Sequence, residues 1–191
     1  MIMNPKAQFP LACRLRSDDP PSLGEVFTFP SGLYFRGKLA YANAFSASYS
    51  EVLETTPTRG LVPAATLIGS DDLREFAEVD IQADDPRYPM TLARDVKQLA
   101  KSLGHKANVV VLGSVATGKY VDVLLAELGM RLVFPADFVG RGDISRGGLL
   151  LRNAVDRIEL NYVAVEGAVR RGKRPPKLEP RRYTPLSQKR G

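Results

Sequence analysis

The three consecutive valines within residues 107–112 are the strongest structural signal in the chain, since such a run favours a strand that is buried on both faces. A glycine-containing loop follows it. A helical pattern then covers 120–128, and Gly129 ends it before a second apolar strand at 131–134. This order predicts a strand–helix–strand crossover whose two strands are parallel.

Weaker patterns predict the elements that precede this crossover. Alternation at 25–29 indicates a strand, apolar spacing at 34–45 indicates a helix, and 51–56 is expected to form a short strand. Ser70 followed by two aspartates is typical of a helix start, and a longer helix is expected over 90–103. Strands and helices are thus predicted to mix along the chain, as in α/β proteins.

The last part of the expected domain is predicted to add two strands, at 147–152 and 157–165, which form an edge hairpin. The predicted fold class is therefore α/β, with three layers, a mainly parallel Rossmann-like or flavodoxin-like sheet and a C-terminal edge β-hairpin. The expected organisation is a flexible N-terminal arm over 1–23, a single α/β domain over 24–165 and a basic, proline-rich tail over 166–191.

Composition limits the classes of protein to consider. With 191 residues, 44% of them hydrophobic and 25% charged, the chain fits one soluble globular domain. A single cysteine, Cys13, excludes an intrachain disulfide framework and favours a reducing compartment, so we expect a cytoplasmic protein. One cysteine and one histidine, His105, are too few for a Cys/His zinc cluster, whereas the composition leaves a carboxylate-based Mg²⁺ site open. Neither a signal peptide nor a membrane span is expected.

The net charge of +6 is concentrated at the C-terminal end of the chain. Residues 166–191 carry nine basic and two acidic side chains, a net charge of +7, whereas the preceding 165 residues carry 18 basic and 19 acidic ones. The tail is therefore the part expected to bind a nucleic acid or an acidic protein, and no membrane contact is expected. Its candidate contacts are Arg170, Arg171, Lys173, Arg174, Lys177, Arg181 and Arg182.

Three loops carry residues that suit an anionic ligand, and the first is Gly113–Lys119. It has the G-x-x-x-x-G-K spacing of a phosphate-binding loop and lies between the valine strand and a helix. Backbone amides at a helix N-terminus attract an anion. Tyr120 replaces the small hydroxyl residue that binds Mg²⁺ in nucleotide-hydrolysing proteins, so a turn with a modest anion site is favoured, with a purely structural turn as the alternative. The candidate contacts are Ser114, Thr117 and Lys119.

The second loop, at 138–148, contains four glycines and two arginines just after a strand. Ligands of open α/β sheets bind at the carboxyl ends of strands, and arginine offers a planar fork to phosphate or carboxylate. A surface loop with solvated arginines is the alternative. The third loop, at 56–60, follows a short strand. The candidate ligand contacts of these two loops are Arg141, Ser145, Arg146, Thr58 and Arg59, and the candidate catalytic base is Asp143.

Two further cations, Arg36 and Lys38, lie near the start of the predicted 34–45 helix. Helix N-termini usually prefer acidic residues, so cations at this place suggest an external anion. A solvated helix face is nevertheless the favoured interpretation for both side chains.

Residues of the same helix stand in an order known from one protein family: Phe35, Arg36, Lys38, Ala40, Tyr41 and Ala42. The loop at 56–61 and Tyr120 on a later helix follow in the same order. Through these residues the chain resembles, from Tyr34 to Leu151, a small bacterial and phage α/β domain of unknown function. Members of that family sometimes occur with transglycosylase-like proteins that modify nucleic-acid bases. The resemblance implies an α/β fold and leaves the activity open.

Together these features favour a protein that binds a phosphorylated or nucleotide- or nucleoside-like molecule at the loops that follow the strands. The alternative is a non-catalytic protein that docks on nucleic acid or on an acidic partner through its tail. The sequence indicates no particular cofactor, and it leaves open whether the protein is an enzyme or an oligomer. A shared ligand site requires Arg59, Lys119 and Arg146 to face one pocket.

Overall fold

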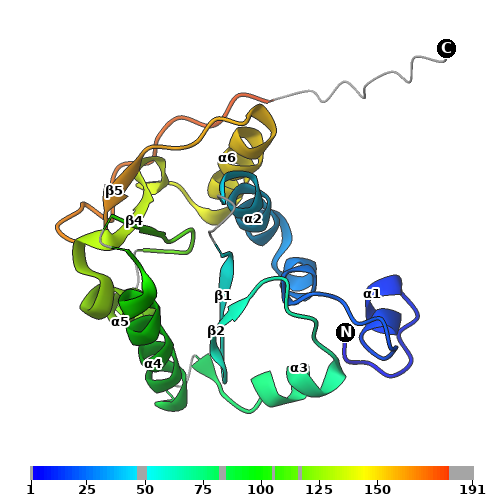
Figure 1. Cartoon of the computed structure of the whole chain (residues 1–191). Helices are drawn as coiled ribbons and strands as arrows, with labels where there is room; N and C mark the ends of the chain where they lie inside the picture. The colour runs from blue at the N-terminus through cyan, green and yellow to red at the C-terminus, as the bar shows by residue number, and fades with distance from the viewer. Residues whose placement is uncertain (1, 47–50, 82–84, 105, 116–117, 181–191) are drawn as a thin grey trace.

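Helices supply most of the regular structure in the computed structural model, which describes residues 2–46, 51–81, 85–104, 106–115 and 118–180 (Figure 1). None of the described helices is long and apolar enough to cross a membrane. The helices are α1 (Pro10–Arg14), α2 (Leu23–Phe45), α3 (Ser70–Phe76), α4 (Arg87–Ser102), α5 (Gly118–Leu128) and α6 (Asp143–Asp156), with 3₁₀ turns η2 (Gly129–Arg131) and η3 (Ala136–Phe138). The strands are β1 (Leu53–Thr56), β2 (Gly60–Pro63), β3 (Val109–Val110), β4 (Leu132–Pro135) and β5 (Tyr162–Ala164).

The predicted strand–helix–strand crossover is confirmed. β3 and β4 pair in parallel, with Val109 opposite Leu132 and Val110 opposite Val133, and α5 connects them. The backbone N–H of Val111 also donates to the carbonyl oxygen of Val133, at 2.8 Å. All four residues of β4 are buried, whereas Val110 is 37% exposed. The burial on both faces that was expected of the valine run is therefore found in β4 and not in β3.

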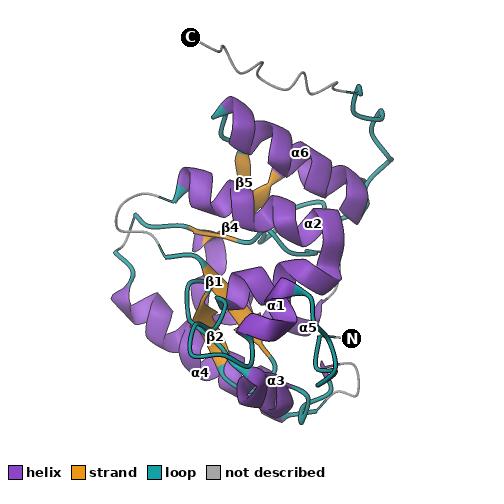
Figure 2. Cartoon of the chain, turned by 90° about the vertical axis from the view of Figure 1, so that its right-hand side faces the viewer, coloured by secondary structure: helices purple, strands orange, loops and turns teal. Residues whose placement is uncertain are grey.

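The predicted three-layer, mainly parallel sheet is wrong. The larger sheet has three strands in the order β3-β4-β5, and β5 runs antiparallel to β4, with Val133 opposite Ala164. β1 and β2 form a separate antiparallel hairpin. The described residues thus contain one parallel strand pair, which is too little for a Rossmann-like or flavodoxin-like fold. Figure 2 shows both sheets as small patches among the helices.

Residues 25–29, predicted as a strand, belong to α2. The Ser22 side chain accepts from the N–H of Glu25 at 3.3 Å, and the Glu25 carboxylate accepts from the N–H of Ser22 at 2.8 Å. This reciprocal capping box starts a helix. Counted from that start, Leu23 and Val26 lie one turn apart and are both buried, so the same residues fit a helical face as well as an alternating strand.

The predicted C-terminal hairpin is also wrong, because residues 147–152 lie in α6. This helix crosses α2 where two glycines meet. A Cβ on Gly147 would lie 2.7 Å from the Cα of Tyr34, and a Cβ on Gly37 would lie 2.6 Å from the carbonyl oxygen of Gly147. The glycines therefore permit close helix–helix contact, where the sequence suggested a loop and a strand. Only β5 remains of the two predicted strands, and it joins the edge of β4.

Two clusters of buried apolar side chains hold these elements together. The larger cluster joins α2, α4, α5, α6 and β4, and its fully buried members include Leu92, Leu132, Phe134 and Leu150. Burying one such side chain contributes roughly 1.5–3 kcal/mol. The smaller cluster joins the first half of α2 to α3 and to the residue that follows α1, and its buried members are Leu15, Leu23, Val26, Ile68 and Phe76.

The described half of the basic tail lies against α6. Arg141, just before this helix, donates to the carbonyl oxygen of Pro176 at 3.5 Å, and Arg152, on the helix, donates to that of Glu179. Leu178, between these two points, packs against the larger core cluster. The tail therefore follows α6 in an extended conformation up to the end of the described residues (Figure 2).

Candidate ligand-binding site

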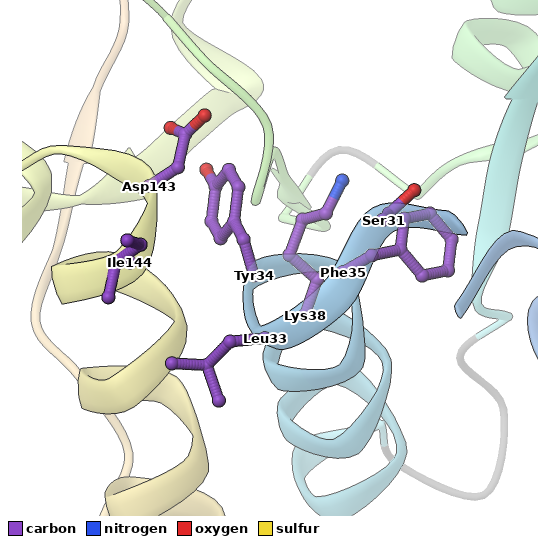
Figure 3. A pocket seen from close by; sticks show the side chains of 7 residues that line it. All are labelled: Ser31, Leu33, Tyr34, Phe35, Lys38, Asp143 and Ile144. Atoms are coloured by element: carbon purple, nitrogen blue, oxygen red, sulfur yellow. The ribbon is translucent and has the colours of Figure 1, made fainter. Parts of the chain in front are cut away.

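A cavity of about 320 Å³ lies between the middle of α2 and the first turn of α6 (Figure 3). This volume is at the lower end of the range for small-molecule sites. The wall combines apolar side chains with one cation, one carboxylate and two hydroxyl groups. Its lining residues are Ser31, Leu33, Tyr34, Phe35 and Lys38 from α2 and Asp143 and Ile144 from α6.

Two helical segments begin at this cavity. Gly32 interrupts α2 with φ of 61° and ψ of −143°, so that Leu33 begins a new helical run, and Asp143 is the first residue of α6. The start of a helix leaves backbone N–H groups without intrahelical partners and carries partial positive charge. Both segments favour negative charge at the cavity, and the Asp143 carboxylate supplies part of it.

Lys38 is the cation of the cavity. Its Nζ lies 5.2 Å from the centre of the Tyr34 ring and 4.6 Å from that of the Phe35 ring, and Figure 3 shows the side chain rising between the two. Burial lowers the pKa of Lys38, while the negative charges of Glu54 and Asp143 act in the opposite direction. Among the described carboxylates none forms an ion pair with this lysine. The ammonium is therefore held by aromatic faces and by charges at longer range.

Glu54, on β1, is electrostatically coupled to Lys38. Burial raises the pKa of this carboxyl to about 7, although the lysine charge acts to lower it. A carboxyl that titrates near neutral pH is suited to take up or release a proton under physiological conditions. Lys38 and Glu54 thus form a coupled pair in which burial disfavours both charged forms.

Two tyrosine hydroxyls donate to carbonyl oxygens just after β3, and one of them, that of Tyr34, belongs to the cavity wall. Tyr34 donates to the carbonyl oxygen of Leu112 at 2.8 Å, and Tyr120 donates to that of Ser114 at 2.6 Å. Burial raises the pKa of Tyr34 to about 12 and also raises that of Tyr120, so both are neutral donors. A Cβ on Gly113 would overlap the Tyr120 hydroxyl. The first glycine of the predicted phosphate loop therefore makes room for a tyrosine of this chain.

The arginines of the 138–148 loop bind their own loop. Arg146 is buried and donates to the carbonyl oxygen of Phe138 at 3.2 and 3.3 Å, and its guanidinium lies 3.7 Å from the Asp143 carboxylate. Arg141 donates to the Ser145 hydroxyl at 3.2 Å. Of the residues predicted for this loop, Asp143 is the one that lines the cavity, where its side chain is 69% exposed.

Thr58 and Arg59 lie at the turn between β1 and β2 and contact α3. The Arg59 guanidinium forms ion pairs with Asp72, at 2.6 Å, and with Glu75. Thr58 donates to Glu75 at 2.7 Å. Because α3 and α6 lie at opposite ends of the molecule (Figure 1), the structure does not bring Arg59 and Arg146 to one pocket.

The other predicted contacts fall into separate places. Ser114 follows β3 and offers its carbonyl oxygen to Tyr120. Arg170, in the tail, forms an ion pair with Asp122 of α5 at 3.8 Å. The exposed tail cations are Arg171, Lys173, Arg174 and Lys177. Outside the described residues lie His105, Thr117, Arg181, Arg182 and the side chain of Lys119.

The sequence places Lys38 near a helix start but does not reveal its pairing with Glu54. A local signal for the lysine exists, because aromatic residues four and three positions earlier, Tyr34 and Phe35, cover it on a helix. Glu54 has no comparable signal, since its burial depends on elements that are distant in the sequence.

In the described part of the chain no group of three or more His, Cys, Asp and Glu side chains could hold a metal ion. The chain matches no protein-family model, and no curated protein or solved structure matches it significantly. The resemblance to the bacterial and phage domain therefore stays a prediction.

Proposed function

We propose that this protein binds a small phosphorylated or nucleotide-like molecule in the cavity between α2 and α6. The observation that carries this proposal is Lys38, a cation that lines the cavity and forms no ion pair with a described carboxylate. Keeping a charge away from water is costly unless a partner compensates it. A phosphate or carboxylate group in the cavity would supply that partner.

The remaining wall suits the same class of ligand. The helical runs that begin at Leu33 and Asp143 direct backbone N–H groups and partial positive charge toward an anion. Leu33, Phe35 and Ile144 offer apolar surface to a sugar or a base, and Ser31 offers a hydroxyl. A volume of about 320 Å³ favours a ligand no larger than a mononucleotide.

Thermal unfolding in the presence of inorganic phosphate, a nucleoside monophosphate and the corresponding nucleoside tests this proposal. A ligand at ten times its Kd stabilises the folded state by about 1.4 kcal/mol. For a chain of this length that corresponds to a rise in Tm of roughly 3–6 °C. We expect the rise with the monophosphate, a smaller one with phosphate, and the smallest with the uncharged nucleoside.

The matched controls are two lysine variants. Lys38→Met removes the cavity cation and should abolish the rise in Tm, whereas Lys101→Met, at an exposed position of α4, should leave it unchanged. A rise that survives Lys38→Met would place the ligand elsewhere. If no anion stabilises the wild-type protein, the proposal is wrong.

We also propose a second function, polyanion binding by the tail, because its exposed cations sit on a backbone that α6 holds in an extended path. Contacts to about five DNA phosphates give a slope of log K against log salt near −4.5, and replacing Lys173, Arg174 and Lys177 by alanine should make it less steep by about 2.7. Replacing Lys97 and Lys101 of α4 is the control. An unchanged slope in the tail variant would contradict this function. Both functions fit a cytoplasmic protein, as proposed from its single cysteine.

A further inference from the structure

We propose that Lys38 is a nucleophilic amine, and that the cavity accepts an anion that also carries an aldehyde or ketone group, with which Lys38 forms an imine. This inference rests on the proposed function, since the anionic group would bring the carbonyl group to the lysine. It adds a chemical class of ligand and a covalent step that binding alone does not require.

The position of the amine carries the inference. Lys38 lines a cavity that is large enough for a small ligand, and the ring centres of Tyr34 and Phe35 lie 5.2 and 4.6 Å from its Nζ. A lysine whose amine is withdrawn from water into apolar surroundings loses its proton more readily and becomes a nucleophile. The exposed Lys97 and Lys101, on α4, lack such surroundings.

The charged groups around Lys38 come from two further elements. Glu54 faces it from β1 and Asp143 from α6, and both negative charges favour the ammonium, as do the two ring faces. Burial acts in the opposite direction and is the largest effect on the pKa of Lys38, which lies below its ordinary value. Lys38 therefore loses its proton, and becomes a neutral amine, more readily than an exposed lysine does.

The proposed step is balanced by the groups present. The proton that the ammonium releases passes through a water molecule to Glu54, whose pKa is about 7. The neutral Nζ attacks the carbonyl carbon, and a carbon–nitrogen bond forms while the carbonyl oxygen becomes a hydroxyl. One N–H proton passes to this oxygen, the nitrogen lone pair forms the carbon–nitrogen double bond, and the hydroxyl leaves as water with the proton that Glu54 returns through solvent. The products are the protonated imine, one molecule of water and the ionised Glu54. Glu54 acts through Lys38 and is a positioning residue.

Reductive trapping tests this step on the full-length chain. Pyruvate, a carboxylate with an adjacent ketone, is incubated with the protein at pH 7 and cyanoborohydride, and adducts are counted by intact mass and located by peptide mapping. We expect a fast phase of about one adduct per chain, located at Lys38. Lys38→Met should lose this phase, and Lys101→Met should retain it. Adducts that accumulate evenly over the lysines would overturn the inference.

Two further measurements separate this inference from the proposed function. Inorganic phosphate should slow the fast phase if both probes occupy one anion site. If Lys38 is labelled fast and phosphate does not slow the labelling, the result supports the reactive amine and contradicts anion binding at the same site. If phosphate raises the Tm but Lys38 is not labelled selectively, the result supports anion binding and overturns the reactive amine.

The role of Glu54 has its own readout. Glu54→Gln removes a negative charge that favours the ammonium, so the midpoint of the pH–rate profile of Lys38 labelling should move to lower pH. The profile of Lys101 in the same sample should not move. An unchanged midpoint at Lys38 would show that Glu54 has no electrostatic role in the reaction.

Discussion

Arg59 and Lys38 are both cations stacked on aromatic rings, but their surroundings differ. The Cζ of Arg59 lies 5.4 Å from the Phe76 ring centre, and its guanidinium is paired with two carboxylates of α3. The side-chain hydrogen bond from Arg59 is the main cause that lowers the pKa of Glu75 to about 2. Lys38 has aromatic contacts of similar length and no described ion-pair partner.

The difference shows that the partners of a cationic side chain, and not its presence in a loop or helix, decide whether it is available to bind a ligand. The Arg59 guanidinium donates its hydrogen bonds to Glu75 of α3 and so links the β1–β2 turn to the smaller core cluster. Lys38 borders a cavity and has no ion-pair partner among the described carboxylates. We therefore expect loss of the Arg59 side chain to alter stability without altering ligand binding, and loss of the Lys38 side chain to alter ligand binding.

The largest effect on stability is expected at the crossing of α2 and α6, the two helices that line the cavity. Gly147→Ala places a methyl group 2.7 Å from the Cα of Tyr34 and 2.8 Å from the carbonyl oxygen of Leu33, both of them backbone atoms. We expect a loss of about 2–3 kcal/mol in the free energy of unfolding, because α2 and α6 must separate. Urea unfolding measures it.

The neighbouring glycine provides the control. A Cβ on Gly148 meets only the flexible end of Leu178, at 3.5 Å. Gly148→Ala should therefore be neutral or stabilise the helix by up to about 1 kcal/mol, since alanine favours helix more than glycine does. Equal losses in both variants would contradict the assignment of Gly147 to the helix crossing.

The next effect concerns Glu54 and depends on pH. Its pKa of about 7 in the folded protein lies above the ordinary value of 4.5, so the folded state holds this proton more tightly than the unfolded state does. The resulting stability is fully present below pH 4.5 and is lost as the pH rises through about 7. Glu54→Gln stays neutral and should exceed the wild type by roughly 2 kcal/mol at pH 8 and match it at pH 4.

Urea unfolding at the two pH values measures this difference, and the exposed Glu51 of the preceding segment provides the control. Glu51→Gln changes an exposed side chain and should alter the stability at pH 8 by less than about 0.5 kcal/mol. A pH-independent difference for Glu54→Gln would show that the carboxyl is not buried as described.

Local patterns were sufficient for part of this fold. The helices at 34–45, 90–103 and 120–128 are confirmed, as is the parallel crossover, because each combines periodic apolar residues with a clear start or stop. The strand predicted at 147–152 failed because Gly147 is required by a contact with Gly37, more than one hundred residues away. No local pattern distinguishes a glycine for helix packing from a glycine for a turn.

The site was predictable to a smaller extent. Asp143, the predicted catalytic base, lines the cavity and its role stays a prediction, while the arginines beside it bind loop carbonyl oxygens. Arg59 was predicted to contact a ligand, but in the structure its guanidinium forms an ion pair with Glu75 of α3. In each case a partner distant in the sequence decides whether a cation is available, and charge patterns do not contain that information.

A smaller effect on stability is expected from removing the Arg59 side chain. Arg59→Ala should lower the free energy of unfolding by about 1–2 kcal/mol, a modest loss because the side chain is 38% exposed, and should leave phosphate binding at the cavity unchanged. Arg74→Ala, whose exposed side chain pairs only with Asp71 among the described residues, should cost less than about 0.5 kcal/mol.

This comparison also has a predicted pH dependence. Glu75 has a pKa of about 2 in the folded protein, below the ordinary 4.5, so its contribution is present above pH 4.5 and lost as the pH falls toward 2. The stability difference between the wild type and Arg59→Ala should therefore shrink over that range. A difference that stays constant from pH 5 to pH 2.5 would mean that packing against Phe76, and not the ion pairs, is what Arg59 contributes.

The smallest effect tests whether the cavity selects negative charge. Asp143→Asn removes a carboxylate from the wall, and because this side chain is 69% exposed, water weakens its repulsion of a bound anion. We expect phosphate to bind about threefold more tightly, equivalent to about 0.6 kcal/mol, in calorimetric titrations at low salt. Asp137→Asn, at an exposed residue of η3 that does not line the cavity, should leave the affinity unchanged. Weaker binding by Asp143→Asn would mean that this carboxylate accepts a hydrogen bond from the ligand, and the cavity would then select a neutral or protonated group, unlike the free anion that Lys38 favours.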